Sequence, residues 1–174
     1  MDLRFCAVGL RAIDALRCEA LALPMFAGER PLPGALGLVD FRLCGLVSRM
    51  MLHGRIDFSV GECVLLPGKP RLSADKVFLF GLGPRQDFSA DSVRPCSRSM
   101  FATLQSAGVR RTALVLPGRQ LGHLPAAAVM RAFLESIPSL PDQDELTVIE
   151  EPDAQREMAP VVEGERRRAR AMRR

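Results

Sequence analysis

The sequence predicts a three-layer α/β fold, in which helices flank a mixed, mostly parallel sheet. Two short runs, residues 77–80 and 112–116, are dominated by apolar side chains instead of alternating with polar ones. This pattern is typical of strands buried on both faces of a parallel sheet. Each run ends in Gly or Pro, and segments with helical periodicity follow, so strands alternate with helices along the chain. A length of 174 residues favours one domain with a sizeable core.

The individual elements follow from the positions of apolar runs and of the residues that interrupt them. The predicted strands are residues 3–8, 20–26, 56–60, 62–66, 77–80, 112–116 and 146–149. The predicted helices are residues 11–18, 38–53, a segment that starts after Asp91 and ends at Gly108, and residues 125–137. The helix at 38–53 has the clearest helical periodicity in its apolar residues, which are Val39, Leu43, Leu46, Val47 and Met50. Residues 27–37, rich in Pro and Gly, predict a loop before it.

The chain changes character after residue 150, so we expect a globular domain over residues 1–150 and a basic, flexible tail over residues 151–174, either solvated or in a frayed helix. The tail has almost no aliphatic stripe, and residues 165–174 contain six Arg and one Glu. Such a cluster neutralises phosphates without reading bases, so the tail is a candidate for weak, non-specific contact with nucleic acid. The candidate residues are Arg166, Arg167, Arg168 and Arg170. The alternative, which we favour, is a solvated segment without a binding role.

Composition points to an ordinary globular protein of the cytoplasm. The net charge is only +4, and nearly all basic residues are Arg, which a codon bias explains without a nucleic-acid partner. The five cysteines form no C-x-x-C pair and are odd in number, which favours buried, reduced thiols over disulfides or a metal site. No signal peptide or run of about 20 apolar residues is present, so we expect a cytoplasmic location and no membrane partner.

Three consecutive segments resemble the N-terminal domain of the cytosol (leucine) aminopeptidases. They read DFRLCGLVSRMMLHG at residues 40–54, FSVGECVLLP at 58–67 and VFLFGLG at 77–83. The order of elements agrees over about residues 3–150. The resemblance implies a macro-like fold, a mixed sheet between helices.

The resemblance transfers no catalytic residue and no metal ligand. In that family the two-metal centre lies in a separate C-terminal domain, and its Asn-Thr-Asp-Ala-Glu-Gly-Arg segment does not occur in this sequence. The two histidines, His53 and His123, have no carboxylate or thiol at ligand spacing. We therefore expect no metal, no cofactor and no aminopeptidase turnover from this chain alone.

A ligand crevice is expected beyond the carboxyl ends of the buried strands, as in other open α/β sheets. Its candidate residues are Gly81, Gly83, Arg85 and Arg119, which would form an anion-accepting site if strands 77–80 and 112–116 are parallel neighbours. Pro84 removes an amide donor from this turn. The alternative, which we favour, is that the two glycines serve only the turn.

The broad apolar face of the helix at 38–53 is a candidate partner surface. Leu38, Met51 and Leu52 widen its stripe beyond what a small domain readily buries, and an exposed remainder would favour a protein partner. The alternative is that all three pack in the core.

The function that the sequence favours is a stand-alone, non-catalytic binding or interaction module, with a protein partner or self-association. One alternative is an accessory or regulatory part of a metallo-aminopeptidase system, acting with a separate catalytic subunit. Another is nucleic-acid binding through the Arg-rich tail, since some bacterial members of the family bind DNA.

Overall fold

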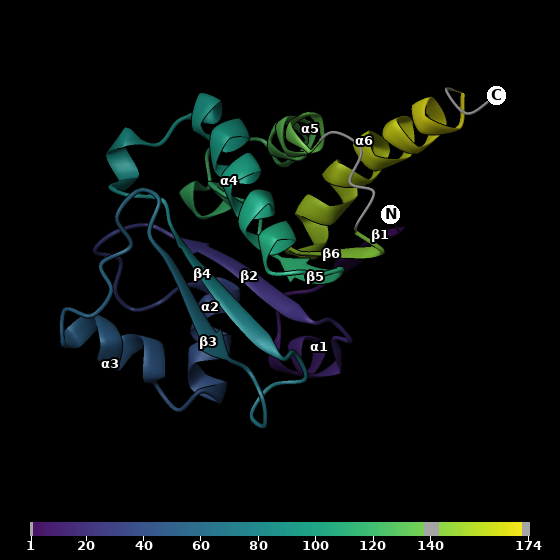
Figure 1. Ribbon diagram of the computed structural model, residues 1–174. Helices are drawn as coiled ribbons and strands as arrows, with labels where there is room; N and C mark the ends of the chain where they lie inside the picture. The colour runs from purple at the N-terminus through teal and green to yellow at the C-terminus, as the bar shows by residue number, and fades with distance from the viewer. Residues whose placement is uncertain (1, 138–142, 172–174) are drawn as a thin grey trace.

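Six strands form one sheet between two layers of helices in the part of the chain that the computed structural model describes (Figure 1). That part is residues 2–137 and 143–171, without the side chains of residues 169 and 170. The strands are β1 (Asp2–Cys6), β2 (Ala20–Met25), β3 (Cys63–Pro67), β4 (Lys76–Gly81), β5 (Arg111–Leu114) and β6 (Glu145–Ile149). Their order across the sheet is β1-β6-β5-β2-β4-β3, and every neighbouring pair is parallel except β3 and β4.

The helices divide evenly between the two faces of this sheet (Figure 1). On one face lie α1 (Leu10–Ala15), α2 (Gly34–Arg42) and α3 (Leu46–Leu52), and on the other lie α4 (Val93–Ser106), α5 (Ala126–Ser136) and α6 (Pro152–Ala171). Strand β4 contributes alternate side chains to the two cores, with Phe78 and Phe80 on the α4 side and Val77 and Leu79 on the α2 side. The predicted three-layer α/β fold with a mostly parallel sheet is confirmed.

The single helix predicted over residues 38–53 is wrong, because the chain forms α2 and α3 with a break between them. At the break, Cys44 and Gly45 have positive φ values of 55° and 72°, which end one helix and redirect the chain. The buried carboxylate of Asp40 then accepts hydrogen bonds from the Val47 amide at 2.7 Å and the Ser48 hydroxyl at 2.6 Å. Asp40 therefore stabilises the start of the second helix. Helix α2 also begins at Gly34, inside the predicted loop.

The strand predicted over residues 56–60 is also absent from the described structure. Phe58 has a φ of 60°, which a strand does not allow, although its ring is buried. The Glu62 carboxylate holds this loop by accepting the amides of Phe58 at 2.6 Å and Asp57 at 3.2 Å. The Phe58 ring is therefore buried by a loop that the Glu62 side chain holds in place, and not by a strand of the sheet.

The residues after 150 were expected to form a solvated tail, and this is wrong for most of them. Residues 152–171 form α6, which packs beside α5 and extends past the sheet at its far end (Figure 1). Ala154, Met158 and Val162 are buried in the core, at a spacing of four residues that places them on one stripe. These small and medium-sized side chains are too few to stand out in a sequence of charged residues.

The five cysteines are free thiols, as expected, but the prediction that they are buried is wrong. Cys44 and Cys63 are exposed, and Cys6, Cys18 and Cys96 are only partly buried. Burial raises the pKa of the Cys18 thiol to about 11, so this thiol stays protonated at neutral pH.

No helix among the described residues is long and apolar enough to cross a bilayer.

Replacing Met158 by Ala tests whether α6 belongs to the folded domain. Because Met158 is fully buried, we expect the free energy of unfolding to fall by about 2–5 kcal/mol, measured by urea denaturation. Arg156→Ala on the exposed side of the same helix should change it by less than about 0.5 kcal/mol. Equal, small effects of both substitutions would contradict the packing of α6.

Candidate functional site

The main crevice lies where the strand order reverses, between the carboxyl ends of β2 and β5. The chain leaves β2 toward β3 and β4 on one side and later crosses to β5 on the other. Crevices at such reversal points are the usual ligand sites of open α/β sheets. The crevice has a volume of about 560 Å³ and extends to the end of β6.

Pro24 near the end of β2 explains why the sheet opens there. The amide of Val115 still bonds to the Ala22 carbonyl at 3.1 Å, so Ala22 directs its backbone groups toward β5. Two residues later Pro24 faces the same side but has no N–H to donate. Its carbonyl accepts instead from the Gln120 side-chain amide at 2.8 Å. The ladder between β2 and β5 therefore ends, and a side chain after β5 takes over the bonding.

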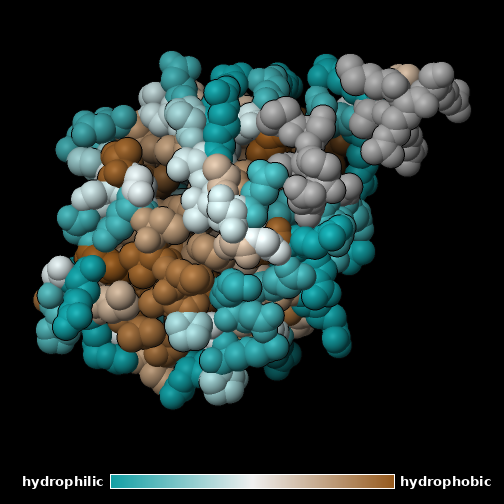
Figure 2. Space-filling model, viewed as in Figure 1, coloured by the Kyte–Doolittle hydropathy of each residue, from teal (hydrophilic) through white to brown (hydrophobic). Residues whose placement is uncertain are grey.

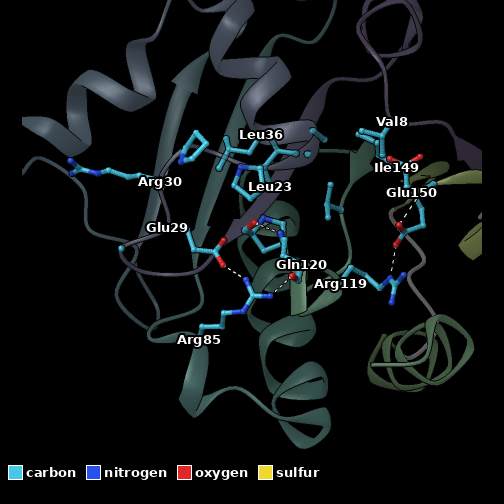
Figure 3. A pocket seen from close by; sticks show the side chains of 18 residues that line it. Val8, Leu23, Glu29, Arg30, Leu36, Arg85, Arg119, Gln120, Ile149 and Glu150 are labelled. Carbon is cyan, nitrogen blue, oxygen red and sulfur yellow. Dashed lines mark hydrogen bonds and ion pairs between the residues drawn. The ribbon is translucent and has the colours of Figure 1, made fainter. Parts of the chain in front are cut away.

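Three arginines line the crevice, and two of them, Arg85 and Arg119, are each bound to a carboxylate (Figure 3). Arg85 forms an ion pair with Glu29, donates to the Gln120 carbonyl at 2.7 Å, and lies 5.8 Å from the centre of the Phe26 ring. The loop after β2, the turn after β4 and the turn after β5 are joined by this one guanidinium.

Arg119 forms the second ion pair, with Glu150, on the opposite side of the crevice. Its Nε lies 2.6 Å from Glu150 Oε2, and its Nη1 donates to the Leu124 carbonyl at 2.7 Å. The side chains are only 15% and 10% exposed. The second oxygen of Glu150 accepts the Glu151 amide at 3.0 Å. This pair holds the carboxyl ends of β5 and β6 together.

The crevice presents unpaired acceptors, whereas Arg85 and Arg119 are already neutralised. In the described part of the chain, Glu29 Oε2 and Gln120 Oε1 are buried atoms without a hydrogen-bond partner. Buried acceptors of this kind cost about 1–3 kcal/mol each unless a donor reaches them. Both residues line the crevice, and these oxygens can only accept hydrogen bonds.

The predicted crevice residues divide into two that line it and two that do not. Arg85 and Arg119 line the crevice. The strands that precede them, β4 and β5, are not the neighbours that this site was expected to need, because β2, which is equally apolar, lies between them. Gly81 and Gly83 do not line it. Their amides bond to the carbonyls of Glu62 and Phe58, and a Cβ on Gly81 would collide with the backbone of Ser59. Both glycines thus accommodate the loop before β3 and leave no cradle for phosphate.

Sequence reasoning missed Glu29, Gln120 and Glu150, which complete the crevice. Glu150 directly follows an apolar strand, and the rule that selected Arg85 and Arg119 also applies to it. Glu29 lies in the Pro- and Gly-rich loop, where a charged residue is expected to face solvent, so the sequence did not indicate that it lines a crevice. Within residues 2–137 and 143–171, no three His, Cys, Asp or Glu side chains gather in a way that could hold a metal ion.

The predicted partner surface is mostly inside the protein. Met51 is buried, and Leu38 is partly buried and packs against the same core, so only Leu52 is exposed, at 68%. Because the predicted helix is two helices, its apolar residues are divided between α2 and α3, and both helices pack on the same core. Other large apolar side chains that are exposed in the described structure are Phe41, Val60 and Leu65.

The arginines near the chain end are engaged by neighbouring groups. Arg166 donates to the Leu3 carbonyl at 2.7 Å, and it also lies 3.6 Å from the Asp2 carboxylate. Arg167 and Arg168 pair with Glu163 and Glu165 on the same helix. The side chain of Arg170 lies outside those described. These contacts give Arg166 a structural role, and binding of nucleic acid stays a prediction.

Residues 22–139 match the family model described as the N-terminal domain of the cytosol aminopeptidase family. The cytosol aminopeptidase of Pseudomonas aeruginosa is 26% identical over 124 residues, which are 71% of this chain and 25% of that protein. A probable cytosol aminopeptidase of Halorhodospira halophila is 30% identical over 89 residues, 51% of this chain and 18% of that protein. The chain thus spans about a quarter or less of the length of these curated relatives.

Solved structures with the same fold include macrodomains and an aminopeptidase. The Trypanosoma brucei macrodomain in complex with ADP has a TM-score of 0.71 at 16% identity, over 92% of this chain and 69% of the macrodomain. A tomato leucine aminopeptidase mutant has a TM-score of 0.58 at 17% identity, over 91% of this chain and 35% of the enzyme. At these identities the likeness establishes the fold.

Removing the carboxylate of Glu150 tests the inner ion pair. Glu150→Ala leaves the mostly buried Arg119 without its counter-charge, so we expect the free energy of unfolding to fall by about 3–5 kcal/mol. Glu145→Ala, which breaks the exposed pair with Arg4, should cost less than about 1 kcal/mol. Urea denaturation of both variants gives the comparison, and similar costs would show that the Arg119–Glu150 pair has no special role.

Proposed function

The chain belongs to the family of cytosol aminopeptidase N-terminal domains, and from this premise we propose that it is a non-catalytic binding module for a small polar molecule. The proposed site is the crevice between the ends of β2, β5 and β6. The family match covers residues 22–139, which include the Glu29, Arg85 and Gln120 wall of that crevice. Because the relatives are cytosol aminopeptidases, we also propose a cytoplasmic location.

One observation carries this proposal: the crevice contains two buried acceptor atoms without donors. Glu29 Oε2 and Gln120 Oε1 lie on the same side of the crevice, and both residues contact Arg85 (Figure 3). A ligand that supplies N–H or O–H groups there removes a desolvation cost that the free protein bears. The volume of about 560 Å³ is within the range of small-molecule sites.

The charge balance of the crevice selects the class of ligand. Arg85 and Arg119 are neutralised by Glu29 and Glu150. The crevice is also lined by Glu151 and by Arg30, whose side chain points away from the other two arginines (Figure 3). A phosphate would have to displace a carboxylate or remain beside it, at a cost in repulsion. We therefore propose an uncharged or positively charged ligand, in contrast to the ADP and ADP-ribose named for the Trypanosoma brucei macrodomain structures.

Calorimetry with ADP-ribose tests the choice of charge. We expect the dissociation constant to be weaker than about 100 µM for the wild-type protein, above about −5.5 kcal/mol. Glu29→Gln releases Arg85 from its counter-charge and should strengthen ADP-ribose binding several-fold, whereas Glu157→Gln on the exposed face of α6 should not. Wild-type affinity near 1 µM would contradict the proposal.

A thermal-shift comparison of phosphate-free compounds tests the ligand class itself. Adenosine, glucosamine and leucinamide carry N–H or O–H donors without negative charge, and we expect one or more of them to raise the melting temperature at millimolar concentration. The rise should disappear in Gln120→Leu, which removes one acceptor, and persist in Gln105→Leu on the exposed face of α4. If only anionic compounds stabilise the protein, the proposed ligand class is wrong.

The family match also favours a second function, that of an accessory part in a metallo-aminopeptidase system. Curated relatives of the chain are whole aminopeptidases, of which the aligned region is about a quarter or less. In this case the module would regulate or assemble with a separate catalytic subunit, and the crevice would sense a small molecule for it.

An assay on leucine p-nitroanilide separates an accessory role from a catalytic one. We expect no turnover by the purified chain with added zinc or manganese, because two-metal hydrolysis needs several carboxylates around one cleft. Turnover that follows the chain through purification and stops with a chelator would contradict both proposed functions.

A further inference from the structure

The sheet has two edges, at β1 and at β3, and they differ in the contacts made by their outward backbone groups. At β1, Arg166 of α6 donates to the Leu3 carbonyl, so a neighbouring element already uses part of that edge. At the other edge, β3 pairs with β4 alone, and no second strand covers it in the described residues. An uncovered edge strand is a ready template for another strand.

The register of β3 shows which of its backbone groups face outward. Gly81 donates to the Glu62 carbonyl at 2.8 Å, and Gly68 donates to the Asp75 carbonyl at 2.9 Å. In an antiparallel ladder the bonded positions alternate, so the even-numbered residues from 62 to 68 bond to β4. Cys63, Leu65 and Pro67 therefore direct their backbone groups away from the sheet. Pro67 has no N–H, but at this outward position the missing N–H removes no hydrogen bond to β4.

The side chains along this edge are apolar and exposed. Leu65 is 54% exposed and Val60 is 74% exposed, and Cys63 and Pro67 are also on the surface. Figure 2 shows a hydrophobic area over β3 that continues toward α3, where Leu52 is exposed. Single exposed apolar residues need no explanation, but here they adjoin a row of free backbone groups.

The charges at the two ends of β3 differ in sign, so two antiparallel copies of the strand would place opposite charges side by side. Before the strand, the acidic residues Asp57 and Glu62 outnumber Arg55. After it, Lys69 forms an ion pair with Asp75 at 2.6 Å, and the additional positive charge of Arg71 leaves the far end basic. Antiparallel pairing with an identical strand brings the acidic end of each copy beside the basic end of the other, whereas parallel pairing brings like charges together.

We propose that β3 is a dimer interface, at which β3 pairs antiparallel with β3 of a second copy of this chain. With Leu65 opposite Leu65 of the second copy, these two residues exchange both backbone hydrogen bonds. The Cys63 amide of each copy then reaches the Pro67 carbonyl of the other. This arrangement has two-fold symmetry and closes on itself, so it gives a dimer and no fibre. It is independent of the crevice.

Sedimentation velocity on the full chain tests the interface. We expect a concentration-dependent dimer for the wild-type protein, and a dissociation constant raised about thirtyfold or more in Leu65→Lys, which places two like charges at the symmetry axis. Phe41→Lys is the matched control, because Phe41 is 65% exposed but lies on α2, and it should leave the dimer unchanged. A wild-type monomer at about 100 µM, or a dimer that Leu65→Lys leaves intact, overturns the proposal.

Disulfide trapping provides a second readout that does not depend on weakening the fold. In a background with Cys44→Ser and Cys63→Ser, Leu65→Cys should oxidise to a covalent dimer, because facing residues in a bonded antiparallel pair have Cα atoms about 5.5 Å apart, within disulfide range. Leu52→Cys in the same background should remain mostly monomeric. Equal trapping at both positions would show random collision and would overturn the proposed register.

Discussion

The constraint on which this structure depends is the complete burial of β2. Every residue of this strand, from Ala20 to Met25, is buried, so it must have a strand on each side and helices over both faces. Strands β4 and β5 supply the two neighbours, and both run parallel to β2, which places three carboxyl ends at one edge. The same strand contains Pro24, whose missing amide ends the pairing with β5 and opens the crevice. One short segment thus sets both the core and the site.

The crevice is built as much by ion pairs as by the backbone. Arg85 joins three loops that come from distant parts of the sequence, and Arg119 joins the ends of β5 and β6 through Glu150. Because each guanidinium is paired with a carboxylate of the protein, these two arginines serve to hold loops and strand ends together. Their positive charge is therefore not free for a ligand. The acceptor atoms of Glu29 and Gln120 still lack hydrogen-bond donors. The fold is macro-like, whereas the charge balance of the crevice follows from the ion pairs of this chain.

The two edges of the sheet show how a helix changes the surface of an α/β domain. Helix α6 covers the β1 side, and its Arg166 bonds to that edge strand. Among the described residues no helix side chain bonds to the outer edge of β3, and the apolar side chains of this strand remain on the surface (Figure 2). The two edges of the sheet therefore differ in how far their backbone groups are used within the protein.

The sequence by itself determined the fold class and most of the strands, because all-apolar runs followed by Gly or Pro admit few structures other than buried parallel strands. It also indicated Arg85 and Arg119, since both follow such strands. Only the tertiary structure decided what these arginines do, because their partners Glu29 and Glu150 are distant in sequence and carry no local signal. The same holds for α6, where burial of Ala154, Met158 and Val162 depends on α5 beside them, and for the helix break at Cys44 and Gly45. Periodicity reports which face of an element is apolar, whereas packing and ion pairing depend on what the fold brings next to it.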